Sequence, residues 1–175
     1  MKILLIRHGE TTGDIEDRYG GFYDDHLTEV GKTQLQETAQ KIRDTKIDII
    51  FSSTLIRAKE SAEIINSILH TRIELRDGLR ERNYGILGGL TKSEALEKYP
   101  EVVELHTDPA NTDQDGESQA LFVERVLSAF ESITQQNYDT VAIVSHGGPI
   151  KVILKHLGMP LPSKIGDGEV IEIVV

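Results

Sequence analysis

A chain of 175 residues, 38% hydrophobic and 27% charged, has the size of one globular domain and enough apolar residues to bury a core. Its 29 acidic residues against 19 Lys and Arg leave a formal charge of −10, which argues against nucleic acid or an anionic membrane surface as a partner. Because the chain has no cysteine, disulfides, zinc–thiolate sites, iron–sulfur clusters and thiol nucleophiles are excluded. No apolar run is long enough for a signal peptide or a membrane span, so we expect a cytoplasmic protein.

The first half of the chain predicts two strand–helix pairs. Residues 3–6 form a wholly apolar run, typical of a strand buried on both faces, which ends abruptly at Arg7 and His8. Residues 28–43 begin with a capping threonine and carry apolar or small residues at helical spacing. Residues 47–51 predict a second buried strand, and the apolar spacing after Ser53 predicts a second helix. This order is typical of an α/β protein.

The second half repeats the pattern. Residues 118–135 predict a helix and residues 140–144 a buried strand, after which a helix is expected to open at Pro149. Shorter runs at 72–75 and 169–175 complete a plausible sheet. The least regular stretch, 81–117, is rich in Gly, Asp, Asn and Thr, and we expect it to form a surface excursion that covers the substrate. The expected fold is one domain over residues 1–175, with three α/β/α layers and a mostly parallel central sheet.

Three predicted strands are followed by residue types that can bind anions or take part in catalysis. In an open α/β sheet, ligands bind outside the carboxyl ends of the strands. Arg7 and His8 follow the first strand, Arg57 lies just after the second, and His146 follows the strand at 140–144. We therefore expect two arginines and two histidines at one rim of the sheet.

This set of residues suits phosphoryl chemistry. Guanidinium groups donate paired hydrogen bonds to phosphate oxygens, and preorganised donors of this kind lower a barrier by roughly 3 kcal/mol each. A neutral histidine beside them can attack phosphorus and form a phosphoryl-enzyme. A leaving alkoxide then needs a proton, for which a carboxylic acid is the usual donor. Glu81, at the start of the excursion, is a candidate that spacing alone does not select.

Three separated motifs carry a resemblance to a known family: Arg7-His8-Gly9-Glu10-Thr11, Ser52-Ser53-x-x-x-Arg57-Ala58, and Ser145-His146-Gly147-Gly148. Together they resemble the histidine phosphatase superfamily, the phosphoglycerate mutase-like proteins, over nearly the whole chain. The resemblance implies the corresponding fold, with neither a metal nor another cofactor. It implies His8 as the phosphorylated nucleophile and Glu81 as the proton donor, with Arg7, Arg57, His146 and Gly147 in the phosphate pocket.

Weaker matches extend the candidate site. The stretch 81–92 is similar to the mutase and bisphosphatase branch, in which the tyrosine and lysine touch the rest of the substrate, and this makes Tyr84 and Lys92 candidates. Gly20 and Gly21 are candidates for lining the phosphate. The alternative is that they form only a turn, as pairs of glycines most often do.

Departures from the family pattern bear on the activity. Where mutases of this family carry an arginine pair for the substrate carboxylate, the aligned positions hold Asp108 and Pro109. An acid cannot bind a carboxylate in that way, so phosphatase activity is favoured over mutase activity. Asp14 stands where the family usually has asparagine, and it either brings a negative charge to the ligand or holds a proton.

The leading hypothesis is a metal-independent phosphatase that acts on a small phosphomonoester. Three alternatives stay open: a phosphoglycerate mutase-type phosphotransferase, a non-catalytic module that binds a phosphate ligand, and a metallohydrolase built from His8, His146 and nearby carboxylates. Exposed edge strands and helices in such a fold can support a homodimer, although no apolar stretch in the sequence identifies an interface.

Overall fold

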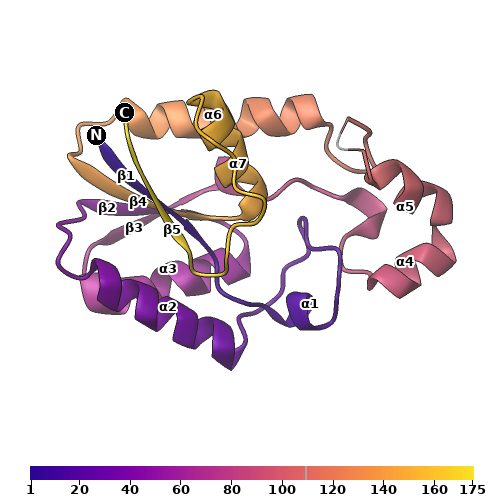
Figure 1. Ribbon diagram of the computed structural model, residues 1–175, viewed down its shortest axis with the longest axis horizontal. Helices are drawn as coiled ribbons and strands as arrows, with labels where there is room; N and C mark the ends of the chain where they lie inside the picture. The colour runs from indigo at the N-terminus through magenta and orange to yellow at the C-terminus, as the bar shows by residue number, and fades with distance from the viewer. Residues whose placement is uncertain (109) are drawn as a thin grey trace.

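A five-stranded sheet forms the centre of the computed structural model, which describes residues 1–108 and 110–175 (Figure 1). Its strands lie in the order β3-β2-β4-β1-β5. The first four are parallel, and β5 runs antiparallel to β1 at the edge. Their bounds are β1 Lys2–Arg7, β2 Ile49–Ser53, β3 Arg72–Arg76, β4 Thr140–Ser145 and β5 Val170–Val174. The mostly parallel sheet is as predicted.

Two helices cover each face of the sheet (Figure 1). Helices α2 (Glu29–Ile42) and α3 (Ile56–Leu69) pack on one face, and α6 (Gln119–Thr134) and α7 (Gly147–His156) pack on the other. Successive strand residues alternate between the two cores: Ile3 and Leu5 contribute to the α6–α7 side, and Leu4 and Ile6 to the α2–α3 side. Because both faces are buried, the strand is continuously apolar, and the three-layer fold is confirmed.

Some helix and strand boundaries differ from the predictions. Strand β2 begins at Ile49, two residues later than expected, and runs on to Ser53. Helix α7 begins at Gly147 instead of at Pro149. Proline is accommodated in a first turn because the N–H groups there have no partner within the helix. The short helix α1 (Thr12–Ile15), held by a capping box between Thr11 and Asp14, was not predicted.

The excursion contains regular structure that its composition does not indicate. Besides the 3₁₀ turns η1 (Asp77–Leu79) and η2 (Gly85–Leu87), the chain forms α4 (Lys92–Lys98) and α5 (Pro100–His106). The expectation of an irregular stretch is therefore wrong for these two helices. Thr91 starts α4 through a capping box, and Pro100 is the first residue of α5, so the signals are local but short. Both helices lie beyond the carboxyl ends of the parallel strands (Figure 1).

The two ends of the described chain meet beside the amino end of β1, at the end of the sheet away from the carboxyl ends of the parallel strands. The amino group of Met1 donates a hydrogen bond of 2.6 Å to the carbonyl oxygen of Val175. None of the helices in residues 1–108 and 110–175 is long and apolar enough to cross a bilayer.

Candidate active site

A cleft of 130 Å³ lies at the carboxyl ends of the parallel strands. It is lined by eight of the eleven residues that the sequence singled out as catalytic or substrate-binding. The three that do not line it are Lys92, His146 and Gly147. Its lining residues are Arg7, His8, Thr11, Gly13, Asp14, Arg18, Gly20, Gly21, Asp25, Arg57, Glu81 and Tyr84.

His8 is held as a neutral ring with one free nitrogen. Its Nδ1 lies 2.8 Å from the carbonyl oxygen of Gly9, and only a protonated nitrogen can donate to a carbonyl. The lone pair is therefore on Nε2. Burial, followed by the positive charge of Arg57, lowers the pKa of His8 to about 3. An unprotonated Nε2 is what a histidine nucleophile needs at neutral pH.

We expect the His8 ring to stay neutral at pH values where an ordinary histidine, with a pKa near 6.5, becomes charged. Correlation of the ring ¹⁵N and ¹H resonances across a pH series measures this, with the His8→Asn variant for assignment. His26 is an internal control, because its hydrogen bond to Glu60 raises its pKa above 6.5. A His8 titration midpoint near 6.5 would contradict the expected burial.

The lowered pKa also makes stability depend on pH. Between about pH 6.5 and 3, the unfolded chain binds a proton at His8 that the native chain does not. The free energy of unfolding should therefore fall as pH decreases through this window, by up to about 1.4 kcal/mol per pH unit for this group.

His146 lies beside His8, with ring centroids 5.0 Å apart. Its Nε2 is 2.8 Å from the hydroxyl oxygen of Ser53, which already accepts a hydrogen bond from the Leu55 N–H. Ser53 is fully buried, and its hydroxyl has no acceptor other than Nε2 of His146 among the described residues, so it donates to Nε2 and the His146 proton is on Nδ1. That Nδ1 is buried and has no hydrogen-bond partner among the described residues. Burial, followed by Arg57, holds the pKa of His146 well below its usual value, so the ring is a neutral donor.

Ser53 thus acts as a positioning residue that sets the His146 tautomer. We expect Ser53→Ala to shift His146 from the Nδ1–H form toward a mixture of tautomers and to lower kcat for an aryl phosphate by about tenfold. Ring ¹⁵N shifts report the tautomer directly. Ser52→Ala is the matched control, because the buried Ser52 hydroxyl donates only to backbone carbonyls. Unchanged His146 ¹⁵N shifts in Ser53→Ala would remove this role.

Both arginines are oriented before any ligand binds. Arg57 forms an ion pair of 3.0 Å with Asp25, and both side chains are 4% exposed. It also donates to the carbonyls of Tyr23 at 2.6 Å and Gly21 at 2.9 Å. Arg7 lies 2.8 Å from Asp167 and donates to the Ile165 carbonyl at 2.7 Å.

Asp14 carries a negative charge in this cleft. Burial raises the pKa of its carboxyl, but hydrogen bonds from the Thr11 hydroxyl and N–H outweigh burial, so the pKa lies below its usual value. Its carboxylate is 3.9 Å from the guanidinium of Arg7. Of the two interpretations of Asp14, the structure therefore supports the ionised one.

Glu81 reaches the cleft because a glycine leaves space for it. Its carboxylate accepts hydrogen bonds from the backbone N–H of Gly148 at 3.0 Å and of Arg82 at 2.9 Å. A Cβ at position 148 would lie only 2.0 Å from Oε1 of Glu81. Gly148 is therefore a site residue that sequence reasoning quoted within a motif without assigning it a role.

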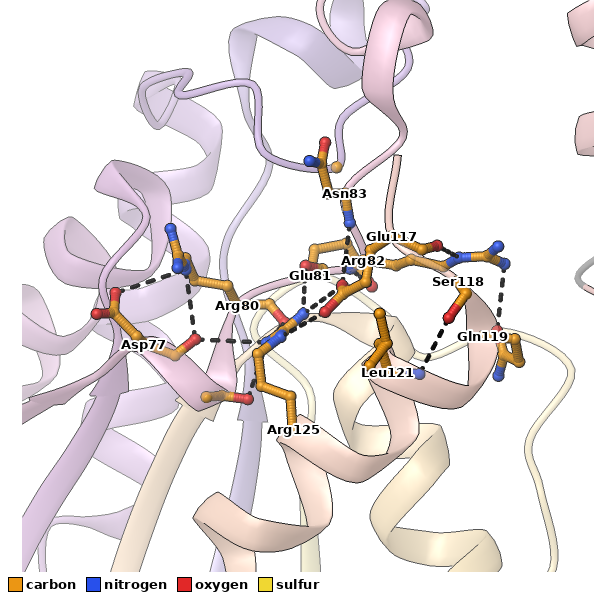
Figure 2. A network of polar contacts seen from close by, with 12 residues as sticks. Asp77, Arg80, Glu81, Arg82, Asn83, Glu117, Ser118, Gln119, Leu121 and Arg125 are labelled. Atoms are coloured by element: carbon orange, nitrogen blue, oxygen red, sulfur yellow. Dashed lines mark hydrogen bonds and ion pairs between the residues drawn. The ribbon is translucent and has the colours of Figure 1, made fainter. Parts of the chain in front are cut away.

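A network around Arg125 holds the backbone that carries Glu81 (Figure 2). Arg125 donates to the carbonyls of Gly78, Arg80 and Glu81 at 3.0, 3.0 and 3.1 Å. The carboxylate of Glu117 accepts two hydrogen bonds from Arg125, at 2.8 and 2.7 Å. The guanidinium of Arg125 thus connects α6 to the start of the excursion and limits movement of the Glu81 backbone.

Three further residues that the sequence predicted for the site are Tyr84, Lys92 and Gly147, and one of them lines the cleft. Tyr84 lines the cleft, and the negative charge of Glu81, together with burial, raises its pKa, so its hydroxyl keeps its proton. Lys92 does not line the cleft: its ammonium lies 2.8 Å from Asp17. Gly147 is the first residue of α7, directly after His146, and also lies outside the lining.

The region aligned with the arginine pair of the mutases is described only in part. Pro109 lies outside the described residues. Asp108 is exposed, and its carboxylate accepts a hydrogen bond of 2.9 Å from the Ala110 N–H.

Sequence reasoning missed several residues of the cleft: Thr11, Gly13, Arg18 and Asp25. They belong to the segment after β1, and no periodicity shows that this segment folds across the carboxyl ends of the strands. A usable signal was the run of Gly and Asp residues at 20–25, which is typical of a close turn. Within residues 1–108 and 110–175, no group of three or more His, Asp or Glu side chains is arranged to hold a metal ion.

Comparison with known proteins adds independent evidence. The model of the histidine phosphatase superfamily (branch 1) matches residues 3–166. The chain is 32% identical over 156 residues to the uncharacterized phosphatase PhoE of Bacillus subtilis, covering 89% of this chain and 76% of that protein. It is 31% identical to phosphoserine phosphatase 1 of Hydrogenobacter thermophilus, covering 87% and 74%. The solved structure of Bacillus stearothermophilus YhfR superimposes with a TM-score of 0.90 at 30% identity, covering 99% and 91%.

Proposed function

This chain belongs to the histidine phosphatase superfamily, and on that premise we propose that it is a metal-independent phosphatase that hydrolyses a small phosphomonoester through a phosphohistidine on His8. The observation that carries the proposal is the neutral His8 ring, whose Nε2 is free because Nδ1 donates to the Gly9 carbonyl. Arg7 and Arg57 line the same cleft, which suits a dianionic group in front of that nitrogen.

In the first step, Nε2 of His8 attacks phosphorus as the bond to the leaving oxygen breaks. The arginines and the Nδ1–H of His146 donate to the non-bridging oxygens as their charge develops. Glu81 takes up a proton as the anionic phosphoryl group binds beside it, and gives that proton to the leaving oxygen. The Gly9 carbonyl, which accepts from Nδ1, stabilises the positive charge that the ring gains on phosphorylation.

In the second step, water attacks the phosphohistidine and the nitrogen–phosphorus bond breaks. Glu81, now a carboxylate, accepts a proton from that water and is again the carboxylic acid. Inorganic phosphate leaves, and His8 is again neutral with a free Nε2. Each atom and proton is thus restored after one turnover.

Asp108 supports hydrolysis over transfer to a second phosphoglycerate. A mutase must hold the carboxylate of its substrate, and the exposed Asp108 carboxylate would repel it. Pro109 adds no charge. Water is then the favoured acceptor of the phosphoryl group.

Mass spectrometry of the intact protein tests the mechanism. The protein is quenched in alkali, which preserves phosphohistidine, during turnover of an aryl phosphate. We expect a mass increase of one phosphoryl group on the wild type and none on His8→Ala, with phosphate release that persists after exhaustive chelation.

Other outcomes would support the alternatives. Phosphate binding with no adduct and no turnover of any ester would indicate a binding module. Isomerisation of a phosphoglycerate, primed by a bisphosphate and faster than hydrolysis, would indicate a mutase. Loss of activity on chelation would indicate a metallohydrolase.

A further inference from the structure

A second, larger cavity of 590 Å³ opens between α6 and α7, beside the catalytic cleft. Glu81 and Tyr84 line both spaces, so the two cavities adjoin at these side chains. In the proposed mechanism Glu81 protonates the leaving oxygen. A leaving group that departs past Glu81 therefore has this second cavity, which we call the α6–α7 pocket, directly in front of it.

The walls of the α6–α7 pocket are largely apolar. Val123 and Leu127, one helical turn apart on α6, are half-buried and face it together with Phe122. Val152 lines it from α7, and Leu161, from the segment after that helix, adds a further apolar side chain. Pockets of a few hundred Å³ with apolar walls are typical of sites for organic groups, not for bare ions.

The end of the α6–α7 pocket away from the cleft is cationic. Gly148, at the first turn of α7, contacts Glu81, whereas Lys151 and Lys155 line the pocket one and two turns further along that helix. Seven residues of α-helix separate Gly148 from Lys155, a distance of about 10 Å. Lys151 donates to the Ser163 carbonyl at 3.1 Å. The Lys155 ammonium has no ion-pair or hydrogen-bond partner in the described part of the chain.

The cationic end of the α6–α7 pocket contrasts with the acidic character of the whole chain. The formal net charge is −10, yet the one carboxylate in the described lining of the α6–α7 pocket is Glu81, at the cleft end. Lysines in the last turns of a helix interact favourably with the helix dipole. This interaction accounts for the presence of these lysines but not for their placement along an apolar cavity.

We propose, resting on the phosphatase function above, that the α6–α7 pocket binds the leaving group of the substrate. The substrate class is a phosphomonoester with an apolar or aromatic body about 10 Å long. It ends in a second anionic group, a carboxylate or a phosphate, that meets Lys155. Apolar contact with the α6 wall and attraction to Lys155 then select the substrate, while the cleft binds the phosphoryl group that all esters share.

Three matched aryl esters test this proposal: phenyl phosphate, the phosphate ester of para-phenylphenol, and that same ester with a carboxylate on the distal para position. The leaving oxygens are all phenolic, so the chemistry of the cleft is nearly constant. We expect kcat/KM to rise about tenfold from the first ester to the second and about three- to tenfold more to the third.

Variants separate the two contributions. Lys155→Met, at an exposed position that does not threaten the fold, should cancel the gain from the carboxylate, and Val123→Trp should cancel the gain from the second ring by filling the pocket. Lys46→Met, an exposed lysine outside the lining of the pocket and the cleft, is the control and should change none of the ratios.

The failures of the two proposals are distinguishable. Equal kcat/KM for the three esters, with a phosphohistidine formed from each, would overturn the role of the α6–α7 pocket and leave the phosphatase in place. Unaltered ester ratios in both Lys155→Met and Val123→Trp would do the same. Absence of the phosphohistidine with every ester would overturn the phosphatase mechanism, and the pocket proposal with it.

Discussion

Replacing His8 by asparagine is expected to lower kcat for an aryl phosphate by on the order of 10⁵-fold, because the variant has no nitrogen that can accept the phosphoryl group. Asparagine is the sharpest choice of variant. Its amide can still donate a hydrogen bond toward the Gly9 carbonyl, which His8 Nδ1 bonds at 2.8 Å, so the loss reports the nucleophile and not the contact. Steady-state phosphate release measures the effect.

The control for this prediction is His70→Asn. His70 is exposed and adopts a left-handed conformation with φ of 51° at the end of α3, which asparagine tolerates well. We expect its kcat to equal that of the wild type. Binding of orthovanadate to His8→Asn, followed by calorimetry, shows whether the arginines of the cleft are still in place. A His8→Asn enzyme with kcat within tenfold of the wild type would refute a nucleophilic role for His8.

Removing the Asp25 carboxylate is expected to cause the largest loss of stability. Asp25 and Arg57 form an ion pair of 3.0 Å with side chains only 4% exposed. In Asp25→Ala the Arg57 charge stays buried without its counter-ion, which costs about 3–5 kcal/mol of unfolding free energy. Urea denaturation at pH 7 measures the difference. Inorganic phosphate should restore part of the loss, since it binds the native state beside the unpaired arginine.

An exposed ion pair provides the matched comparison. Lys32 and Glu29 lie 2.6 Å apart on the surface of α2, where the Glu29 side chain is 89% exposed. Because water and salt screen such a pair, Glu29→Ala should leave the urea midpoint within experimental error of the wild type. Equal midpoints for Asp25→Ala and Glu29→Ala would show that burial does not strengthen the dependence of Arg57 on its partner.

The arginines that line the cleft are paired with carboxylates. Each described arginine that lines it already has a carboxylate partner: Asp25 for Arg57, Asp167 for Arg7 and Glu16 for Arg18. The cations are therefore held in position without a ligand, and little reorganisation is needed when a phosphoryl group arrives. The overall charge of −10 does not oppose binding inside the cleft, because screening confines long-range repulsion to about 8 Å.

The sequence by itself determined the layered fold and the centre of the site. Continuous apolar runs predicted strands buried on both faces, and the capping residues Thr28 and Ser118 marked where α2 and α6 begin. Parallel strands bring their carboxyl ends to one edge of the sheet. That rule was enough to predict that Arg7, His8 and Arg57 would meet, since each follows or ends a strand.

The tertiary structure alone decided how those groups are tuned and what surrounds them. The ion pair between Asp25 and Arg57 joins residues 32 apart, and the bond that sets the His146 tautomer joins residues 93 apart. Local periodicity carries no information about such pairs, because it reports only which face of an element is buried. For the same reason the sequence could not place Lys92 on Asp17, nor show a cavity between α6 and α7 that only their packing creates.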